Sequence, residues 1–289
     1  MVPLGIRIYG LGAMAIGLVG LVWGDFALQW QPVPAGLPGR TVLAYIFSAA
    51  LLVAGALVND RGSRAVTGFA AHGSAGGAAT VSVVVGSRSA AVGSAALATL
   101  YAVVVIFMHG PQIFQHPGAF PAWDGAAEQL ALLAGGLAAY AYLSGADSGL
   151  ARPPGLALLG PHARLARISV ILMGICLLMF GLAHFLYLDF TASMVPAWLP
   201  GGQKFWAAVT GAGHLAAGIA FLTGVKARLA AIALTVMFAV FGALVHLPLL
   251  LADPHGHLSW VMNAINLALT GAAWALATLL QSTPAAIRS

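Results

Sequence analysis

The sequence predicts an all-α integral membrane protein with eight transmembrane helices, arranged as two tandem four-helix bundles. Three observations support this prediction. The chain is 61% hydrophobic and only 7% charged, and its mean hydropathy is +0.95, values that are typical of polytopic helical membrane proteins. Long apolar runs recur along the chain, and motifs of the first half return in the second half.

Each apolar run is long enough to cross the hydrocarbon core of a bilayer, which takes about 20 mostly apolar residues. The runs are 4–23, 41–58, 90–110, 125–144, 168–188, 205–223, 229–251 and 260–280. No charged residue lies in the central third of any run. The first run is followed by an aromatic and polar stretch without a small-x-small cleavage site, so we expect a retained helix and not a removed signal peptide.

Lys and Arg residues gather on one side of the predicted membrane. Most lie at the chain ends or in even-numbered connections: Arg7, Arg61, Arg64, Arg88, Arg152, Arg164, Arg167, Lys226, Arg228 and Arg288. Only Arg40 and Lys204 lie in odd-numbered connections. This bias predicts a cell inner membrane protein with cytoplasmic termini. The net charge of +5 then reflects topology, and we expect the lipid bilayer, not nucleic acid, as partner.

The two halves share motifs in the same order. His109-Gly-Pro111 corresponds to His246-Leu-Pro248, and Trp123 corresponds to Trp260. We expect a first repeat over 1–150, a linker over 151–164 and a second repeat over 165–289. Residues 62–88 are rich in Gly, Ala and Ser, so they predict a flexible cytoplasmic insert within the first repeat. Since each repeat has an even number of crossings, the copies are expected to be related by a pseudo-two-fold axis along the membrane normal.

The second half resembles the DoxX-like family of four-helix membrane proteins. The resemblance rests on Gly181-Leu-Ala-His184, on Pro196-Ala-Trp-Leu-Pro200 and on the small-residue pattern Thr210–Gly224, and it covers 165–280 and, more weakly, the first half. It implies a four-helix bundle and a redox setting, because some members are subunits of thiosulfate:quinone oxidoreductases. The family's acidic position on the second helix is His214 here. This difference indicates that the second half carries the site and that the first half is a scaffold.

Three histidines lie inside the predicted second bundle, one on each of three helices. His184 and His246 are expected about 6–7 Å below the outer end of their helices, and His214 about 15 Å deep. Imidazoles at such depths are costly unless they have a role. They would act as catalytic proton-handling groups beside a quinone, or as ligands of haem, copper or zinc. The alternative is that each ring hydrogen-bonds a neighbouring carbonyl and fills a helix interface.

The last outer connection contains Asp253-Pro-His255-Gly-His257. In an extended segment, a His-x-His spacing places both rings on one side. With the Asp253 carboxylate, these rings would suit copper, nickel or zinc. A polar turn is the alternative interpretation, because Pro and Gly are common in such turns.

Four further residues are candidates for cofactor binding. Asn263 and Asn266 lie three positions apart on one helix face and would either donate to a quinone oxygen or join helices as hydrogen-bonding groups. Trp198 and Trp206 flank the proline-rich loop and would either wall a flat pocket or belong to an interfacial aromatic belt.

These features predict a membrane redox subunit that exchanges electrons and protons between an extracytoplasmic donor and membrane quinone. Two alternatives stay open: a non-enzymatic metal- or haem-binding carrier or assembly factor, and a structural subunit of a larger complex with an extracytoplasmic or membrane protein partner. The sequence leaves open whether the chain is catalytic. It contains no P-loop, dinucleotide fingerprint or HExxH motif, and its single cysteine, Cys176, excludes an internal disulfide.

Overall fold

The computed structural model describes residues 1–60, 65–66, 83–84, 86–147 and 161–282. Apart from the two-residue strands β1 (Ala65–Val66) and β2 (Val83–Val84), which pair antiparallel, these regions are helices and their connections. The long helices are α1 (Leu4–Trp23), α2 (Arg40–Asn59), α3 (Gly86–Val103), α5 (Phe120–Asp147), α7 (Pro161–Leu186), α9 (Gln203–Thr223), α10 (Ala227–Phe241) and α12 (His257–Ser282). Short segments are η1 (Leu28–Trp30), η2 (Val104–His109), α4 (Gly110–Gln115), α8 (Leu188–Met194), η3 (Gly242–His246) and α11 (Leu247–Ala252).

Seven helical stretches among the described residues are long and apolar enough to cross a membrane, as expected of a multi-pass membrane protein. They are Leu4–Trp23, Arg40–Asn59, Arg88–Gln115, Pro161–Leu186, Gln203–Thr223, Ala227–Ala252 and His257–Gln281. The predicted run 125–144 lies within α5, which is not one of the seven. The first turns of α5 carry the polar side chains of Asp124, Glu128 and Gln129, which lower its apolar character.

The predicted linker 151–164 and the predicted insert 62–88 lie largely outside the described residues, and the described parts correct one boundary of each. The predicted linker 151–164 ends too late, because its residues 161–164 already belong to α7. Its remaining residues lie outside the described regions. Most of the predicted insert 62–88 also lies outside them, and α3 begins at Gly86, inside the predicted insert.

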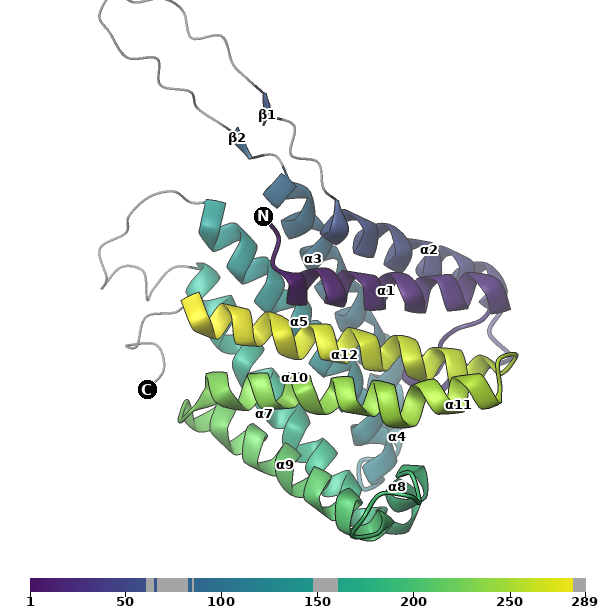
Figure 1. The fold of residues 1–289 in the computed structure, drawn as a ribbon. Coiled ribbons are helices and arrows are strands. Elements are labelled where there is room, and N and C mark those ends of the chain that lie inside the picture. Colours follow the sequence, from purple (N-terminus) through teal and green to yellow (C-terminus); the bar gives the residue numbers. More distant parts are fainter. Residues whose placement is uncertain (61–64, 67–82, 85, 148–160, 283–289) are drawn as a thin grey trace, which may run out of the picture.

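The long helices form a closed ring in chain order: each packs on the long helices before and after it, and α12 packs on α1. α1 packs on α2 and α12, α3 packs on α2 and α5, α7 packs on α5 and α9, and α10 packs on α9 and α12. α5 and α12 also pack on each other. In Figure 1 the start of α1 and the end of α12 lie toward the left of the helices, and α8 and α11 lie toward the right. We call this second side the far end of the molecule.

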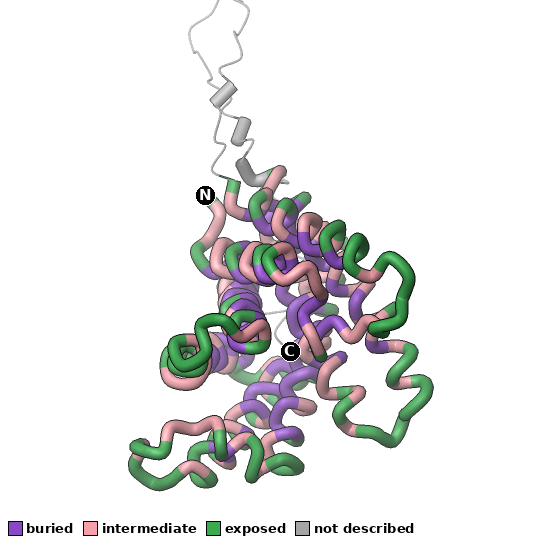
Figure 2. Tube along the Cα trace, turned by 90° about the vertical axis from the view of Figure 1, so that its right-hand side faces the viewer, coloured by how far each residue is buried: buried purple, intermediate pink, exposed green. Residues whose placement is uncertain are grey.

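Small residues let the central helices approach closely. A Cβ atom on Gly271 of α12 would overlap the backbone of Tyr9 on α1, and one on Gly12 of α1 would overlap Ala268. This close approach is typical of membrane helix pairs, which associate by packing and not by excluding water from apolar surface. Buried residues follow the inward sides of the helices, and exposed residues lie on the outside and in the connections (Figure 2).

The same irregularity interrupts one helix in each half. η2 and η3 are π-helical segments that end at His109 and His246, and Pro111 and Pro248 follow two residues later. Proline has no N–H to donate, and its ring crowds the carbonyl one turn earlier, so the helix widens before it. The two His-x-Pro motifs therefore have the same local structure. In both halves the widened turn places a histidine near the far end.

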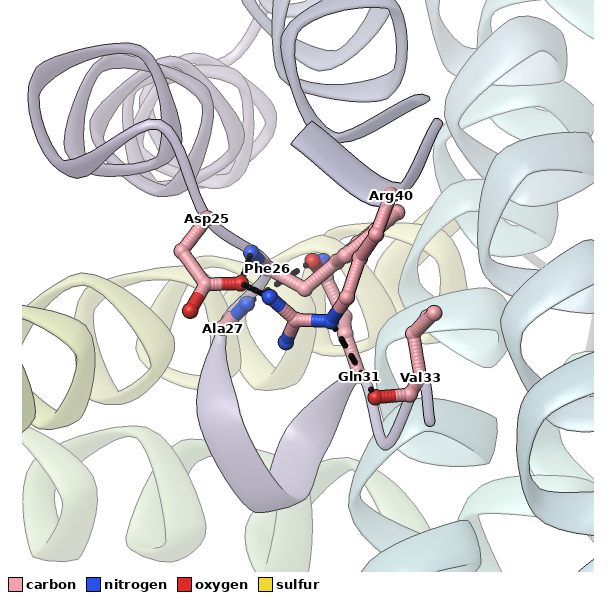
Figure 3. A network of polar contacts seen from close by, with 6 residues as sticks. All are labelled: Asp25, Phe26, Ala27, Gln31, Val33 and Arg40. Carbon is pink, nitrogen blue, oxygen red and sulfur yellow. Dashed lines mark hydrogen bonds and ion pairs between the residues drawn. The ribbon is translucent and has the colours of Figure 1, made fainter. Parts of the chain in front are cut away.

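An ion pair closes the first far-end connection of each half. Arg40 at the start of α2 pairs with Asp25, and its Nε donates to the Val33 carbonyl (3.4 Å) (Figure 3). Lys204 near the start of α9 pairs with Asp189 (2.6 Å) at the same sequence separation. Arg40 and Lys204 are the two cations that depart from the charge bias of the sequence. Each of them is neutralised by an acid in its own connection.

Candidate functional site

A cavity of about 940 Å³ lies near the far end, and residues of both halves line it. The second half contributes residues of α7, α8, α9, α10, η3 and α12, and the first half contributes residues of η1, η2, α4 and α5. Its polar lining includes five histidines and two carboxyl groups: His109, His116, His184, His214, His246, Asp124 and Glu128. The first half, for which the sequence predicts only a scaffold, also contributes side chains to this cavity, because α5 packs against both α7 and α12 and brings its first turns to it.

His214 is one of the two most enclosed histidines in this lining, together with His109. It is only 2% exposed, and neither of its ring nitrogens has a hydrogen-bond partner. The backbone carbonyl of Thr210, one turn earlier on α9, acts on the ring electrostatically. Its position relative to the ring nitrogens does not meet the criteria for a hydrogen bond. Aromatic rings surround the imidazole, with centroid distances of 5.7 Å to Phe180, 5.8 Å to Phe238 and 6.3 Å to Phe241. A buried polar group without a partner is costly, so His214 is available to a ligand.

His184 lies next to His214, and the centroids of the two rings are 5.1 Å apart. Its Nδ1 is 2.8 Å from the carbonyl oxygen of Phe180, one turn earlier on α7. Because a carbonyl oxygen can only accept, Nδ1 carries the proton and Nε2 is left as an acceptor. The structure thus brings together two of the three predicted histidines, one with a fixed tautomer and one without any partner.

His246 lines the same cavity from the end of η3 and is half-buried. Its Nδ1 has no hydrogen-bond partner. The widened turn changes the direction in which this ring leaves the helix, which the sequence spacing alone could not show. All three histidines predicted from the sequence therefore line one cavity, although their roles stay predictions.

The two asparagines are placed differently from each other. The Nδ2 of Asn263 donates to the carbonyls of His246 (2.7 Å) and Ser259 (2.9 Å), and Asn263 does not line the cavity. Its amide joins α12 to the π-helical turn, which favours the helix-joining interpretation. Asn266 does line the cavity, and its Nδ2 donates to the Phe238 carbonyl (3.1 Å). Its carbonyl oxygen is left to accept from a ligand.

Trp198 and Trp206 do not form a wall of the cavity, so that prediction is wrong. Trp198 is 70% exposed, and the indole of Trp206 donates to the Pro200 carbonyl (2.7 Å). The same contact recurs twice, from Trp123 to Pro117 and from Trp260 to Pro254, both at 2.9 Å. These contacts brace far-end turns, in agreement with a belt of interfacial tryptophans.

The predicted metal centre is not formed. Among the described residues no three His, Cys, Asp or Glu side chains come together closely enough to hold an ion. The set His184, His214 and His246 therefore does not converge on one metal. In the Asp253-His255-His257 segment, the ring of His257 stacks on Trp23 at 5.0 Å and 10°. This stacking turns the His257 ring toward α1, and His255 and Asp253 are exposed in the turn before α12.

The sequence did not lead us to propose any lining residue of the first half as a site residue, and His109, Asp124 and Glu128 are among them. His109 is 2% exposed, and its Nε2 donates to the Trp30 carbonyl at 3.1 Å. Its ring packs on α5 at Gly125, where a Cβ would lie 3.2 Å from the imidazole. Asp124 and Glu128 lie one turn apart on the same helix face. The repeat could have signalled His109, because it corresponds to His246, whereas the carboxyl groups gave no such signal.

Comparison with known families gives a match to the second half. A family model described as a domain of unknown function (DUF8561) matches residues 173–279. The matched region contains His184, His214, His246 and Asn266 but none of the lining residues from the first half. No curated protein and no solved structure matches the chain. The resemblance to the DoxX-like family stays a prediction.

Proposed function

We propose that this protein is a membrane redox subunit that binds a quinone in the far-end cavity and exchanges electrons and protons between it and an extracytoplasmic donor. One observation carries the proposal: the His214 imidazole is almost fully buried, has no partner within the protein, and faces a cavity with aromatic walls. A ligand with a carbonyl oxygen would satisfy this ring, and a flat apolar ligand would suit the rings around it.

A quinone head group matches both requirements. Its ring would lie against Phe180, Phe238 and Phe241, and aromatic pairs of this kind contribute about 0.5–1.5 kcal/mol beyond area burial. One quinone oxygen would accept from His214. The cavity volume of about 940 Å³ is within the range of sites that enclose a small molecule. The prenyl tail would extend toward the bilayer.

The proposed reaction consumes two electrons and two protons for each quinone reduced to quinol. The electrons come from a donor on the extracytoplasmic side. The protons pass through the imidazoles of His184 and His214, because a ring nitrogen of an imidazole can both accept a proton and donate it. His246 and the Asn266 oxygen would hold the second quinol oxygen, His246 as donor and Asn266 as acceptor.

We also propose that α5 is an eighth crossing and that the halves are related by a pseudo-two-fold axis along the membrane normal. The contacts support this: when α1, α2, α3 and α5 are exchanged for α7, α9, α10 and α12, the set of packed helix pairs is unchanged. The two π-helical turns and the two ion pairs support it further. The charge bias supports cytoplasmic termini and a cavity on the outer side of an inner membrane.

Haem binding is a second candidate, and one observation favours it. The Nδ1 of His184 is held by a backbone carbonyl (2.8 Å), which leaves Nε2 free and oriented, as in many metal-bound histidines. Haem needs only two protein ligands, and His246 would be the second. In this role the protein would be a carrier or assembly factor. A structural subunit without ligand is the remaining alternative.

The test is quinone binding by the purified chain in lipid nanodiscs, followed by quenching of tryptophan fluorescence, since Trp30 lines the cavity. We expect His214→Phe to keep the aromatic packing but weaken binding roughly 5- to 30-fold, the equivalent of about 1–2 kcal/mol for one buried hydrogen bond. His255→Phe is the matched control because His255 lies outside the cavity lining. Absence of quinone binding by the unmodified chain would overturn the proposal. A Soret band lost in His184→Ala and His246→Ala would favour haem.

A further inference from the structure

Two carboxyl groups of the first half face the cavity without a cationic partner. Asp124 and Glu128 line it from the first turns of α5. The ion pairs of the described residues use other acids, Asp25 and Asp189. No Lys or Arg lies among the lining residues. A carboxyl group near the membrane interior without a counter-ion is costly, so it is a functional candidate by default.

These carboxyl groups share their cavity with an unpartnered imidazole, which is an independent feature that points to a ligand. His214, on a different half of the chain, is 2% exposed, unpartnered and part of the same lining. The other titratable groups that line the cavity are His109, His116, His184, Tyr187 and His246. The cavity thus holds carboxyl and imidazole groups, which both exchange protons, and no fixed positive charge among its lining residues.

We propose that Asp124 and Glu128 form the proton-exchange route between outer water and the quinone site; this inference rests on the proposed function. Asp124 lies in the second turn of α5, next to the far-end connection, and Glu128 lies about 6 Å further along the helix. Protons therefore enter at Asp124, pass to Glu128 and reach the imidazoles of His184 and His214.

The proton balance of the route is closed. Glu128 first donates a proton to an imidazole, and the resulting imidazolium passes that proton to a quinone oxygen and returns to its neutral form. Asp124 reprotonates Glu128, outer water reprotonates Asp124, and the sequence runs twice. Each quinone thus gains two protons by this route and two electrons from the donor, which is oxidised by two electrons, and both oxygen atoms become hydroxyl groups. The two protons of each quinol thus come from the extracytoplasmic side.

The experiment uses the full chain in nanodiscs with bound quinone, and dithionite as a surrogate electron donor in place of the natural one. Quinone affinity and the rate of quinone reduction are measured separately. We expect Glu128→Gln to leave the affinity within about twofold and to slow reduction at least tenfold. Asp124→Asn should slow quinone reduction less, because water that enters the cavity can protonate Glu128 directly. Asp189→Asn is the matched control, since Asp189 is exposed, paired with Lys204 and outside the lining.

Chemical rescue separates proton transfer from a structural role. A small diffusible acid such as formic acid should restore much of the rate in Glu128→Gln, and Glu128→Asp should retain a partial rate. Normal reduction by Glu128→Gln, or a slow rate that formic acid does not restore, would overturn the inference while quinone binding survives. If the unmodified chain binds no quinone, the proposed function itself fails.

Discussion

Hydrogen-bond partners, and not depth alone, distinguish the histidines of the cavity. The Nδ1 of His184 and the Nε2 of His109 donate to backbone carbonyls of Phe180 and Trp30. These contacts fix the tautomers and orient the rings. His214 has no such contact and is the deepest of the three histidines expected in the second bundle. The ring without a protein partner is therefore the one on which a ligand would have the largest effect.

The two asparagines of α12 should separate stability from binding. We expect Asn263→Ala to lower the free energy of unfolding by about 1 kcal/mol, because hydrogen bonds between membrane helices contribute on this scale, and to leave quinone affinity unchanged. Asn266→Ala should lower both, since Asn266 also lines the cavity. Unfolding in mixed detergent micelles and the fluorescence titration measure the two quantities. Equal losses of affinity in both variants would contradict the assignment.

The sequence predicted part of the site at this scale. His184 and His246 could be placed near the outer ends of their helices, and His214 deeper, because apolar runs define the membrane and each residue has a known rise. The directions of side chains in turns could not be predicted in this way. Trp206 turns back to Pro200, and His257 turns to Trp23, through local contacts that spacing does not encode.

Helix limits followed from apolar runs where lipid surrounds the helix. The run 41–58 is found as Arg40–Asn59, and the run 4–23 coincides with α1. Agreement was poorer where helices continue beyond the apolar region, as α7 does into the predicted linker. The π-helical turns were not predicted, although the duplicated His-x-Pro motifs that accompany them were visible in the sequence.

The contact between α1 and α12 should be sensitive to a single methyl group. We expect Gly271→Ala to destabilise the protein by about 3 kcal/mol, because the new Cβ would overlap the backbone of Tyr9 and neither backbone can give way. Gly213→Ala on α9 is the control: its Cβ would meet only the Met237 sulfur at 3.6 Å. The control should be neutral or more stable by at most about 1 kcal/mol. Thermal unfolding in detergent compares them, and equal melting temperatures would contradict the packing.

At the scale of the whole molecule, the sequence predicts a repeat but not the shared cavity. Corresponding motifs such as those at His109 and His246 predict two copies, but the sequence does not say which faces of the two halves meet. The contacts of α5 with α7 and α12 bring Asp124 and Glu128 to the histidines of the second half. The site thus depends on side chains distant in sequence, which local patterns cannot connect.

Membrane topology should follow the charge bias. In single-cysteine variants with Cys176→Ala, we expect Ala35→Cys and Gly118→Cys to react with an impermeant maleimide on intact cells. Lys226→Cys should react only after lysis. Ala35 lies in the far-end connection between α1 and α2, and Gly118 lies in the one between α4 and α5. All three positions are exposed. Labelling of Lys226→Cys on intact cells, or protection of either far-end position, would contradict the eight-helix arrangement.

The corresponding histidines that end the two π-helical segments have different surroundings. The Nε2 of His109 donates a hydrogen bond to a backbone oxygen, whereas the Nδ1 of His246 has no hydrogen-bond partner. In an assembly of identical chains, every substitution would appear in each copy. Joining the two units in one polypeptide removes this restriction. Within one polypeptide, one histidine can be structural while its counterpart keeps a nitrogen for other uses.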